Sequence, residues 1–145
     1  MKSLFIGLLF VTNIAQADDL VIHAVSWHSR PSWKENQDNE TIRYNDYNPG
    51  LGYRWSNGWN VGFYYNSFYK TSVYSAKEFM LTDKFGLVVG GITGYKSSVG
   101  YSVVPLTAAE WRQPITDKFS TAVMILPPFR STPCVLHFVA EYKLK

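Results

Sequence analysis

An apolar and β-branched run, LVIHAVSWHSR at residues 20–30, opens the part of the chain that folds. This composition is typical of a β-strand, and the strand becomes polar where Ser26, His28 and Arg30 appear. A long polar loop follows, and the chain then returns as YNDYNPGLG at residues 44–52. A histidine therefore stands where a rigid strand opens into a long loop, and such a position is typical of a functional site.

The start of the chain has the composition of a secretory signal peptide. A short positive region is followed by the apolar run of residues 4–11 and by AQA at residues 15–17, which fits a cleavage site. The apolar run is too short to form a transmembrane helix. We therefore expect a cleaved signal peptide over residues 1–17 and a single β-domain over residues 18–145.

Composition narrows the class of protein. The net charge of +3 is spread out and offers no basic cluster for nucleic acid, so no nucleic-acid partner is expected. Cys134 is the only cysteine, which excludes an internal disulfide. No spacing of His, Cys, Asp or Glu is typical of a metal site, and no glycine loop is typical of phosphate binding, so we expect no metal and no cofactor.

Aromatic residues make up 17% of the sequence, and tyrosine is the commonest of them. In an exported, strand-rich chain this indicates the aromatic girdles of an outer-membrane barrel. The alternative is a soluble periplasmic barrel with a ligand cavity.

Turn signals, such as SNG at residues 56–58, divide the chain after residue 18 into eight segments. The expected strands cover 20–29, 44–55, 59–68, 72–81, 84–95, 100–109, 118–127 and 134–144. Eight is an even number, and most of these strands are long enough to cross a bilayer when tilted. We therefore predict an all-β fold, namely an eight-stranded antiparallel up-and-down transmembrane β-barrel.

The first strand indicates what fills the barrel. Leu20, Ile22 and Ala24 are expected on one face and Val21 and Val25 on the other, so both faces are apolar. An apolar interior over part of the height fits either a packed core or a pocket for a hydrocarbon chain, and both remain open.

The up-and-down order of the strands brings three polar residues to the same rim. Asn66 and Ser67 end the third strand, and His28 ends the first. A hydroxyl, an imidazole that takes its proton and a group that holds the imidazole are the components that acyl transfer needs. Each also has an ordinary structural interpretation, as a rim histidine bonded to backbone, a hydroxyl that caps a turn, and a turn-forming amide. His23 and His137 are expected to be structural.

These segments resemble the outer-membrane lipid A palmitoyltransferases, the PagP family. WHSR at residues 27–30, YNDY at 44–47 and NSF at 66–68 resemble, in order and spacing, that family's Trp-His-Ala-Arg, Tyr-Asn-Glu-Arg and Asp-Ser-Phe segments. The resemblance covers the first half of the exported chain well, and the second half mainly through layout and prolines.

The resemblance implies a monomeric barrel in the outer membrane of a Gram-negative cell. It would move a fatty acyl chain from a phospholipid donor to lipid A without a cofactor. His28 would act as the base and Ser67 as the partner hydroxyl. Asn66 stands where the family carries an aspartate, so it would orient the site without a charge.

Substrate contacts are also expected outside this group, and the lateral opening among them is implied by the resemblance. From the residues alone, Arg30 is a candidate partner for a lipid phosphate, with a solvated loop charge as the equal alternative, and Tyr44 is expected to fix the return of the loop at the substrate site. Pro105 and Pro127 would mark a lateral opening, because proline cannot donate to the strand ladder. Two alternatives remain, a non-catalytic barrel of the same ancestry that binds lipid or another envelope component, and a soluble lipocalin-like carrier.

Overall fold

The structure is a computed structural model, and it describes residues 18–35, 40–96, 100–130 and 132–145. The expected signal peptide over residues 1–17 lies outside these ranges. The strands are β1 (Asp19–His28), β2 (Ser32–Glu35), β3 (Glu40–Arg43), β4 (Tyr47–Arg54), β5 (Trp59–Tyr65), β6 (Thr71–Met80), β7 (Phe85–Thr93), β8 (Val103–Pro114), β9 (Phe119–Leu126) and β10 (Val135–Lys143). Within the described ranges, no helix is long and apolar enough to cross a membrane.

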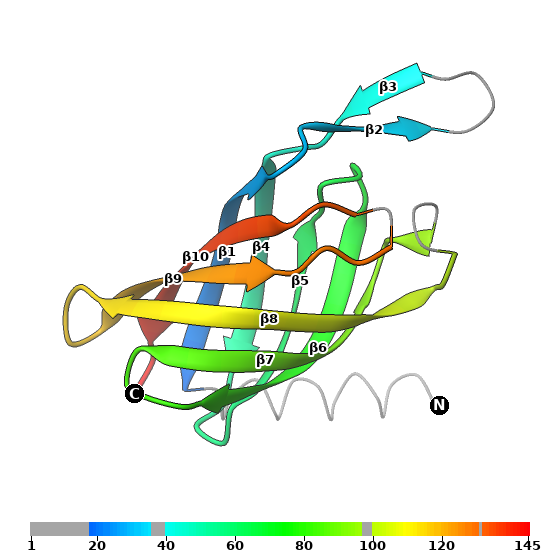
Figure 1. The fold of residues 1–145 in the computed structure, drawn as a ribbon. Helices are drawn as coiled ribbons and strands as arrows, with labels where there is room; N and C mark the ends of the chain where they lie inside the picture. Colours follow the sequence, from blue (N-terminus) through cyan, green and yellow to red (C-terminus); the bar gives the residue numbers. More distant parts are fainter. Residues whose placement is uncertain (1–17, 36–39, 97–99, 131) are drawn as a thin grey trace.

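Eight of the strands close into a barrel in the order β1-β10-β9-β8-β7-β6-β5-β4 (Figure 1). All neighbouring pairs in the barrel are antiparallel, and β1 closes it by pairing with both β10 and β4. Closure pairs the backbone groups of the wall within the wall, except where the first part of β8 runs past the end of β9. The predicted all-β, eight-stranded, antiparallel up-and-down barrel is confirmed.

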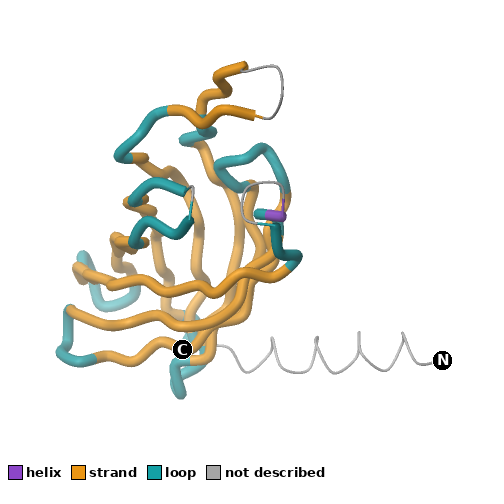
Figure 2. Tube along the Cα trace, turned by 45° about the vertical axis from the view of Figure 1, so that its right-hand side comes forward, coloured by secondary structure: helices purple, strands orange, loops and turns teal. Residues whose placement is uncertain are grey.

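Two elements differ from the prediction. The polar loop after β1 contains a separate two-stranded hairpin, β2–β3, which projects beyond one rim of the barrel (Figure 1). The sixth barrel strand was expected over residues 100–109, but β8 runs from Val103 to Pro114. The second half of β8 was not predicted as strand because Glu110 and Arg112 are charged. In the folded barrel these two side chains form an ion pair inside it. Figure 2 shows that loops and turns lie at the two ends of the barrel strands.

A bulge in β1 decides which of its side chains point inward. The register against β10 shifts between His23 and Val25, so that the chain gains one residue there. Val21 and His23 are buried, Val25 is exposed, and Ser26 and His28 are buried again. The expectation that Val21 and Val25 share a face is therefore wrong, because a bulge reverses the alternation beyond it.

The outer wall of the barrel is apolar. Its middle carries exposed aliphatic and phenylalanine side chains, among them Ile22, Val25, Leu51, Phe63, Leu87, Ile125 and Phe138. Exposed aromatic residues lie towards both ends, with Trp59, Phe79, Phe85, Trp111 and Tyr142 at the turn end and Trp27, Tyr47, Tyr65, Tyr69 and Tyr101 at the loop end. A soluble barrel would show the reverse, with polar residues facing outward.

The interior is layered along its height. At the turn end, Arg54 and Arg112 pair with four carboxylates, and Arg54 Nη1 lies 2.5 Å from Glu141 Oε1. The other three carboxylates are those of Asp19, Glu78 and Glu110. An apolar layer built from Ala76, Val88, Ala108 and Met124 follows. The interior is thus apolar over part of its height, as expected, but one end is closed by charges that the sequence pattern did not reveal.

Candidate functional site

His28 and Ser67 meet at the loop end of the barrel. His28 is the last residue of β1, and Ser67 lies in the turn that follows β5. The Nε2 atom of His28 lies 2.7 Å from Ser67 Oγ, and both side chains are buried. The prediction that the topology brings these two residues to one rim is confirmed.

A carboxylate completes the chain of hydrogen bonds, and it comes from Asp46. Asp46 Oδ1 lies 3.0 Å from His28 Nδ1, and its carboxylate also pairs with Arg43 at 3.5 Å. With Nδ1–H donating to Asp46, Nε2 is left to accept the hydroxyl proton of Ser67. Sequence reasoning missed Asp46, although it lies in the YNDY segment that carried the resemblance. The available signal was a carboxylate directly before β4, the strand that pairs with β1.

Asn66 does not take the place of that carboxylate. Its Nδ2 donates to Ser72 Oγ at 2.9 Å and to the carbonyl of Gly94 at 3.1 Å. Its Oδ1 accepts from the backbone N–H groups of Phe68 and Lys70. The side chain is fully buried and engaged in shaping the turn that carries the catalytic serine candidate. The predicted orienting role towards His28 is thus filled by Asp46, and Asn66 acts as the turn former.

The loop that returns into β4 holds the site together. Tyr44 is buried and stacks on the imidazole of His28, with ring centroids 4.6 Å apart and planes inclined by 10°. The next residue, Asn45, donates its backbone N–H to the carbonyl of Ser67 at 2.9 Å. One short segment therefore fixes the imidazole by stacking, by the Asp46 carboxylate and by its link to the serine turn. Arg30 lies exposed beyond the end of β1.

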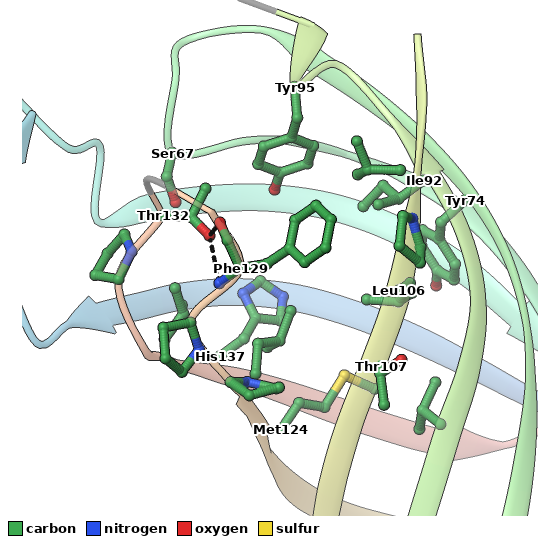
Figure 3. Close-up of a pocket in the computed structure, with 18 of the residues that line it drawn as sticks. Ser67, Tyr74, Ile92, Tyr95, Leu106, Thr107, Met124, Phe129, Thr132 and His137 are labelled. Carbon is green, nitrogen blue, oxygen red and sulfur yellow. Dashed lines mark hydrogen bonds between the residues drawn. The ribbon is translucent and has the colours of Figure 1, made fainter. Parts of the chain in front are cut away.

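A cavity of about 430 Å³ lies next to this group inside the barrel (Figure 3). His28 and Ser67 are part of its lining, as is the stacked Tyr44. Its walls are largely apolar and include Ile92, Val104, Leu106, Met124, Leu126 and Val135. The volume lies within the range of roughly 300–1,000 Å³ that is typical of small-molecule sites. The open choice between a packed core and a pocket is thus resolved in favour of a pocket above a packed layer.

Pro105 and Pro127 lie on the two sides of an unpaired part of the wall. Val103 to Thr107 pair with β7 on one edge, whereas the ladder to β9 begins only at the pair Ala109 and Ile125. Pro105 and Thr107 are exposed on the outside and yet line the cavity, as do Pro127 and Pro128 across from them. Among the described residues, the cavity therefore reaches the outer wall between β8 and β9, where proline provides no N–H for pairing.

The cavity also contains polar groups. His23 and His137 lie side by side, and Tyr74 and Asn60 continue from His23. Tyr64 and Tyr95 share a hydrogen bond of 2.8 Å between their hydroxyls. Burial raises the pKa of the Tyr95 phenol, so this hydroxyl stays protonated. Within the described ranges, no group of three or more His, Cys, Asp or Glu side chains is arranged to hold a metal ion.

No protein-family model matches this chain, and no curated protein is similar to it in sequence. Among solved structures, it is similar to the solution NMR structure of a de novo designed protein, TMB2.3. The TM-score is 0.52 and the sequence identity is 14%, and the match covers 89% of this chain and 95% of the designed one. At this identity the likeness establishes the barrel fold alone.

Proposed function

We propose that this protein is an outer-membrane acyltransferase, similar to the lipid A palmitoyltransferases. It moves a fatty acyl chain from a phospholipid to lipid A in a Gram-negative cell. The observation that carries the proposal is the hydrogen-bonded chain of Ser67, His28 and Asp46 at an apolar cavity.

Two features of the barrel support a place in the outer membrane. Its outer wall is apolar in the middle and aromatic towards both ends, as in barrels that cross a bilayer. Its closed ladder pairs most of the backbone groups that lipid could not satisfy, the stretch between the first part of β8 and the end of β9 excepted. The signal-peptide composition of residues 1–17 fits export to that membrane.

The proposed reaction proceeds in two transfers. In the first, Ser67 Oγ attacks the ester carbonyl of the phospholipid while its proton moves to His28 Nε2. The ester bond to the glycerol oxygen breaks, and that oxygen takes the proton and leaves as a lysophospholipid. In the second, His28 accepts the proton of a lipid A hydroxyl that attacks the acyl group on Ser67, and the proton returns to Oγ. Asp46 stabilises the imidazolium in both transfers.

The unpaired wall between β8 and β9 offers a route for the donor. A phospholipid in the bilayer would pass its acyl chain between Pro105 and Pro127 into the cavity, while its headgroup stays at the rim. Arg30, exposed at the same end of the barrel, supplies a cation for a phosphate.

Mass spectrometry of lipid A tests the proposal. The host is a Gram-negative strain without its own palmitoyltransferase, and it expresses the full chain, His28→Ala, Ser67→Ala or the control Ser75→Ala. Ser75 is exposed on the outer face of β6, so its loss leaves the site intact. We expect a gain of one acyl chain with the wild type and the control, and none with the two site variants. A folded outer-membrane barrel that produces no gain would instead support a non-catalytic lipid-binding barrel.

A further inference from the structure

The unpaired stretch of wall between β8 and β9 is bounded at both of its ends. Towards the turn end, the ladder between the two strands begins with the pair Ala109 and Ile125. Towards the loop end, Arg130 Nη2 donates to the hydroxyl of Tyr101 at 3.2 Å. Tyr101 precedes β8 and Arg130 follows β9, so this contact joins the two edges of the gap. The lateral opening of the cavity is therefore a window in the wall, with Arg130 at its loop end.

Aromatic rings hold the guanidinium of Arg130 at this window. Its Cζ lies 4.9 Å from the centroid of the Tyr101 ring and 6.0 Å from that of the Phe129 ring. Phe129 is also part of the cavity lining (Figure 3), so the cation lies beside the mouth of the cavity. The backbone of Arg130 has φ of 52°, a left-handed conformation that is uncommon for residues other than glycine. Two rings and an unusual backbone conformation thus place a positive charge at the window.

Arg130 has no carboxylate partner among the described residues. Arg43, Arg54 and Arg112, in contrast, each pair with at least one aspartate or glutamate. Arg130 is exposed, and its described side-chain contacts are one hydroxyl and two rings. A guanidinium has five N–H donors in a planar fork that matches two oxygens of a phosphate. Arg130 therefore keeps N–H groups that an anion at the window can use.

The aromatic belt at the loop end places Arg130 at the depth of lipid headgroups. Tyr101 is one of the exposed members of this belt, and tyrosines of this kind lie at the interface between membrane and water. Arg30 lies at the same end of the barrel, but it follows β1, which β10 separates from β9. Arg130, and not Arg30, is thus the arginine beside the window.

We infer that Arg130 binds the phosphodiester of the donor phospholipid while one acyl chain of that lipid enters the cavity through the window. The phosphodiester is common to all phospholipids, so the site recognises this class of lipid and not one headgroup. Lipid A also carries phosphate, but it reacts through a hydroxyl, so the chain that must occupy the cavity is the donor's. The inference rests on the proposed function, because acyl transfer makes a phospholipid the donor.

The test measures which of two lipids the full barrel binds in mixed micelles. The barrel carries Ser67→Ala so that acyl transfer does not consume the lipids. The micelles contain equal amounts of dipalmitoyl phosphatidylethanolamine and dipalmitoylglycerol, which have the same chains and differ in the phosphodiester headgroup. Native mass spectrometry counts each lipid that stays bound to a barrel. We expect the phospholipid to be bound at least about tenfold more often, because a hydrogen bond between two charged groups is stronger than a neutral one.

Three variants of this barrel show whether Arg130 causes the preference. Arg130→Gln removes the charge and should bring the ratio of the two bound lipids close to one. Arg130→Lys keeps the charge without the planar fork and should give an intermediate ratio. Lys118→Gln removes a positive charge from an exposed turn at the opposite end and should keep the full ratio. A ratio near one before any change at Arg130 overturns the inference, and so does an equal ratio in Arg130→Gln and Lys118→Gln.

Two competitors identify the source of the phosphate. Inorganic phosphate and lipid A are added in turn at tenfold excess over the phospholipid, and we expect the preference to persist, because the chain in the cavity adds to the affinity of the phospholipid. Loss of the preference with inorganic phosphate would define a site for a free anion. Loss with lipid A would assign Arg130 to the acceptor. Either loss overturns the assignment to the donor.

The lipid A measurement, made with Ser67 restored, separates this inference from the proposed function. An Arg130→Gln barrel that transfers acyl chains from limiting phospholipid as fast as the wild type overturns the inference and leaves acyl transfer standing. A barrel whose preference for the phospholipid depends on Arg130, but which adds nothing to lipid A, retains the phosphate site and overturns the transfer.

Discussion

At the scale of single residues, the candidate site depends on what each ring nitrogen of His28 contacts. Nδ1 faces Asp46 and Nε2 faces Ser67, so the imidazole has a fixed orientation and a defined tautomer. Stacking on Tyr44 holds the plane of the ring as well. This is the arrangement that a base needs if it is to accept a proton from a neighbouring hydroxyl.

The first residue prediction concerns Asp46→Asn. The amide of asparagine can donate to Nδ1 and so hold His28 in the wrong tautomer, and it carries no negative charge to stabilise the imidazolium. The corresponding change in a serine triad lowers kcat by about 10⁴-fold. We expect the rate of acyl transfer to fall by at least about 10²-fold on the same reasoning. The measurement is a time course of acyl gain with purified barrel in micelles. Asp83→Asn, in an exposed turn, is the matched control, and equal rates for the two variants would exclude a role for Asp46.

The second residue prediction concerns Asn66→Asp, which introduces the aspartate that the PagP family carries in the similar segment. Here the new oxygen would replace a donor to Ser72 and to the carbonyl of Gly94. The buried carbonyl of Gly94 would then face the carboxylate of the new aspartate and lose its N–H donor. We therefore expect the free energy of unfolding to fall by about 1–3 kcal/mol, with no gain in acyl transfer.

The measurement is denaturant unfolding in micelles, followed by tryptophan fluorescence. Asn57→Asp is the control, because the Asn57 side chain only accepts there, from the N–H of Trp59. An Asn66→Asp barrel that is as stable as the wild type and transfers faster would show that Asn66, not Asp46, occupies the carboxylate position.

At the scale of elements, the bulge in β1 and the end of β7 shape the site. Without the bulge, His23 and His28 would face opposite sides of the wall, since they are five residues apart. The bulge turns both imidazoles inward, His23 towards His137 and His28 towards Ser67. At the end of β7, Gly94 lies against the turn that carries the serine.

The element prediction concerns Gly94→Ala. Gly94 has φ of +91°, and a Cβ there would lie 2.7 Å from Asn66 Nδ2 and 2.6 Å from Ser72 Oγ. An alanine at this positive φ costs about 1–2 kcal/mol, and its Cβ would also displace the turn that carries Ser67. The free energy of unfolding and the rate of acyl transfer should therefore both fall. Gly100→Ala is a matched control, since Gly100 has φ of +85° but no atom within 4 Å of such a Cβ. Equal effects of the two changes on transfer would show that the contact with the serine turn does not matter.

At the scale of the whole molecule, the barrel has apolar residues outside and many polar ones inside. The internal charges at the turn end form a paired cluster, and the cavity occupies the opposite half. Such a distribution is stable where the surroundings are apolar, because the outer wall is then not exposed to water.

The prediction at this scale compares Leu51→Arg with Tyr47→Arg, both on the outer face of β4. Leu51 lies in the middle of the strand, next to Ile22 and Phe63, whereas Tyr47 begins the strand at the loop end. In a bilayer, arginine should cost about 2–4 kcal/mol at the middle and about 0–1 kcal/mol near the interface. Unfolding from lipid vesicles measures the difference. Equal costs at the two positions would contradict a membrane-spanning wall.

The sequence by itself determined the eight strands of the barrel, their antiparallel order and the shared rim of His28 and Ser67, because turn signals are local and the order of the strands fixes where each one ends. It did not reveal the bulge, the hairpin in the long loop or the buried charges of β8, since each depends on the hydrogen bonds or charges of another segment of the chain. Only the tertiary structure decided that Asp46 holds His28 and that His23 reaches His137, from residues 18 and 114 positions apart. Contacts between residues so far apart in the sequence form only when the barrel closes, so no local sequence pattern predicts them.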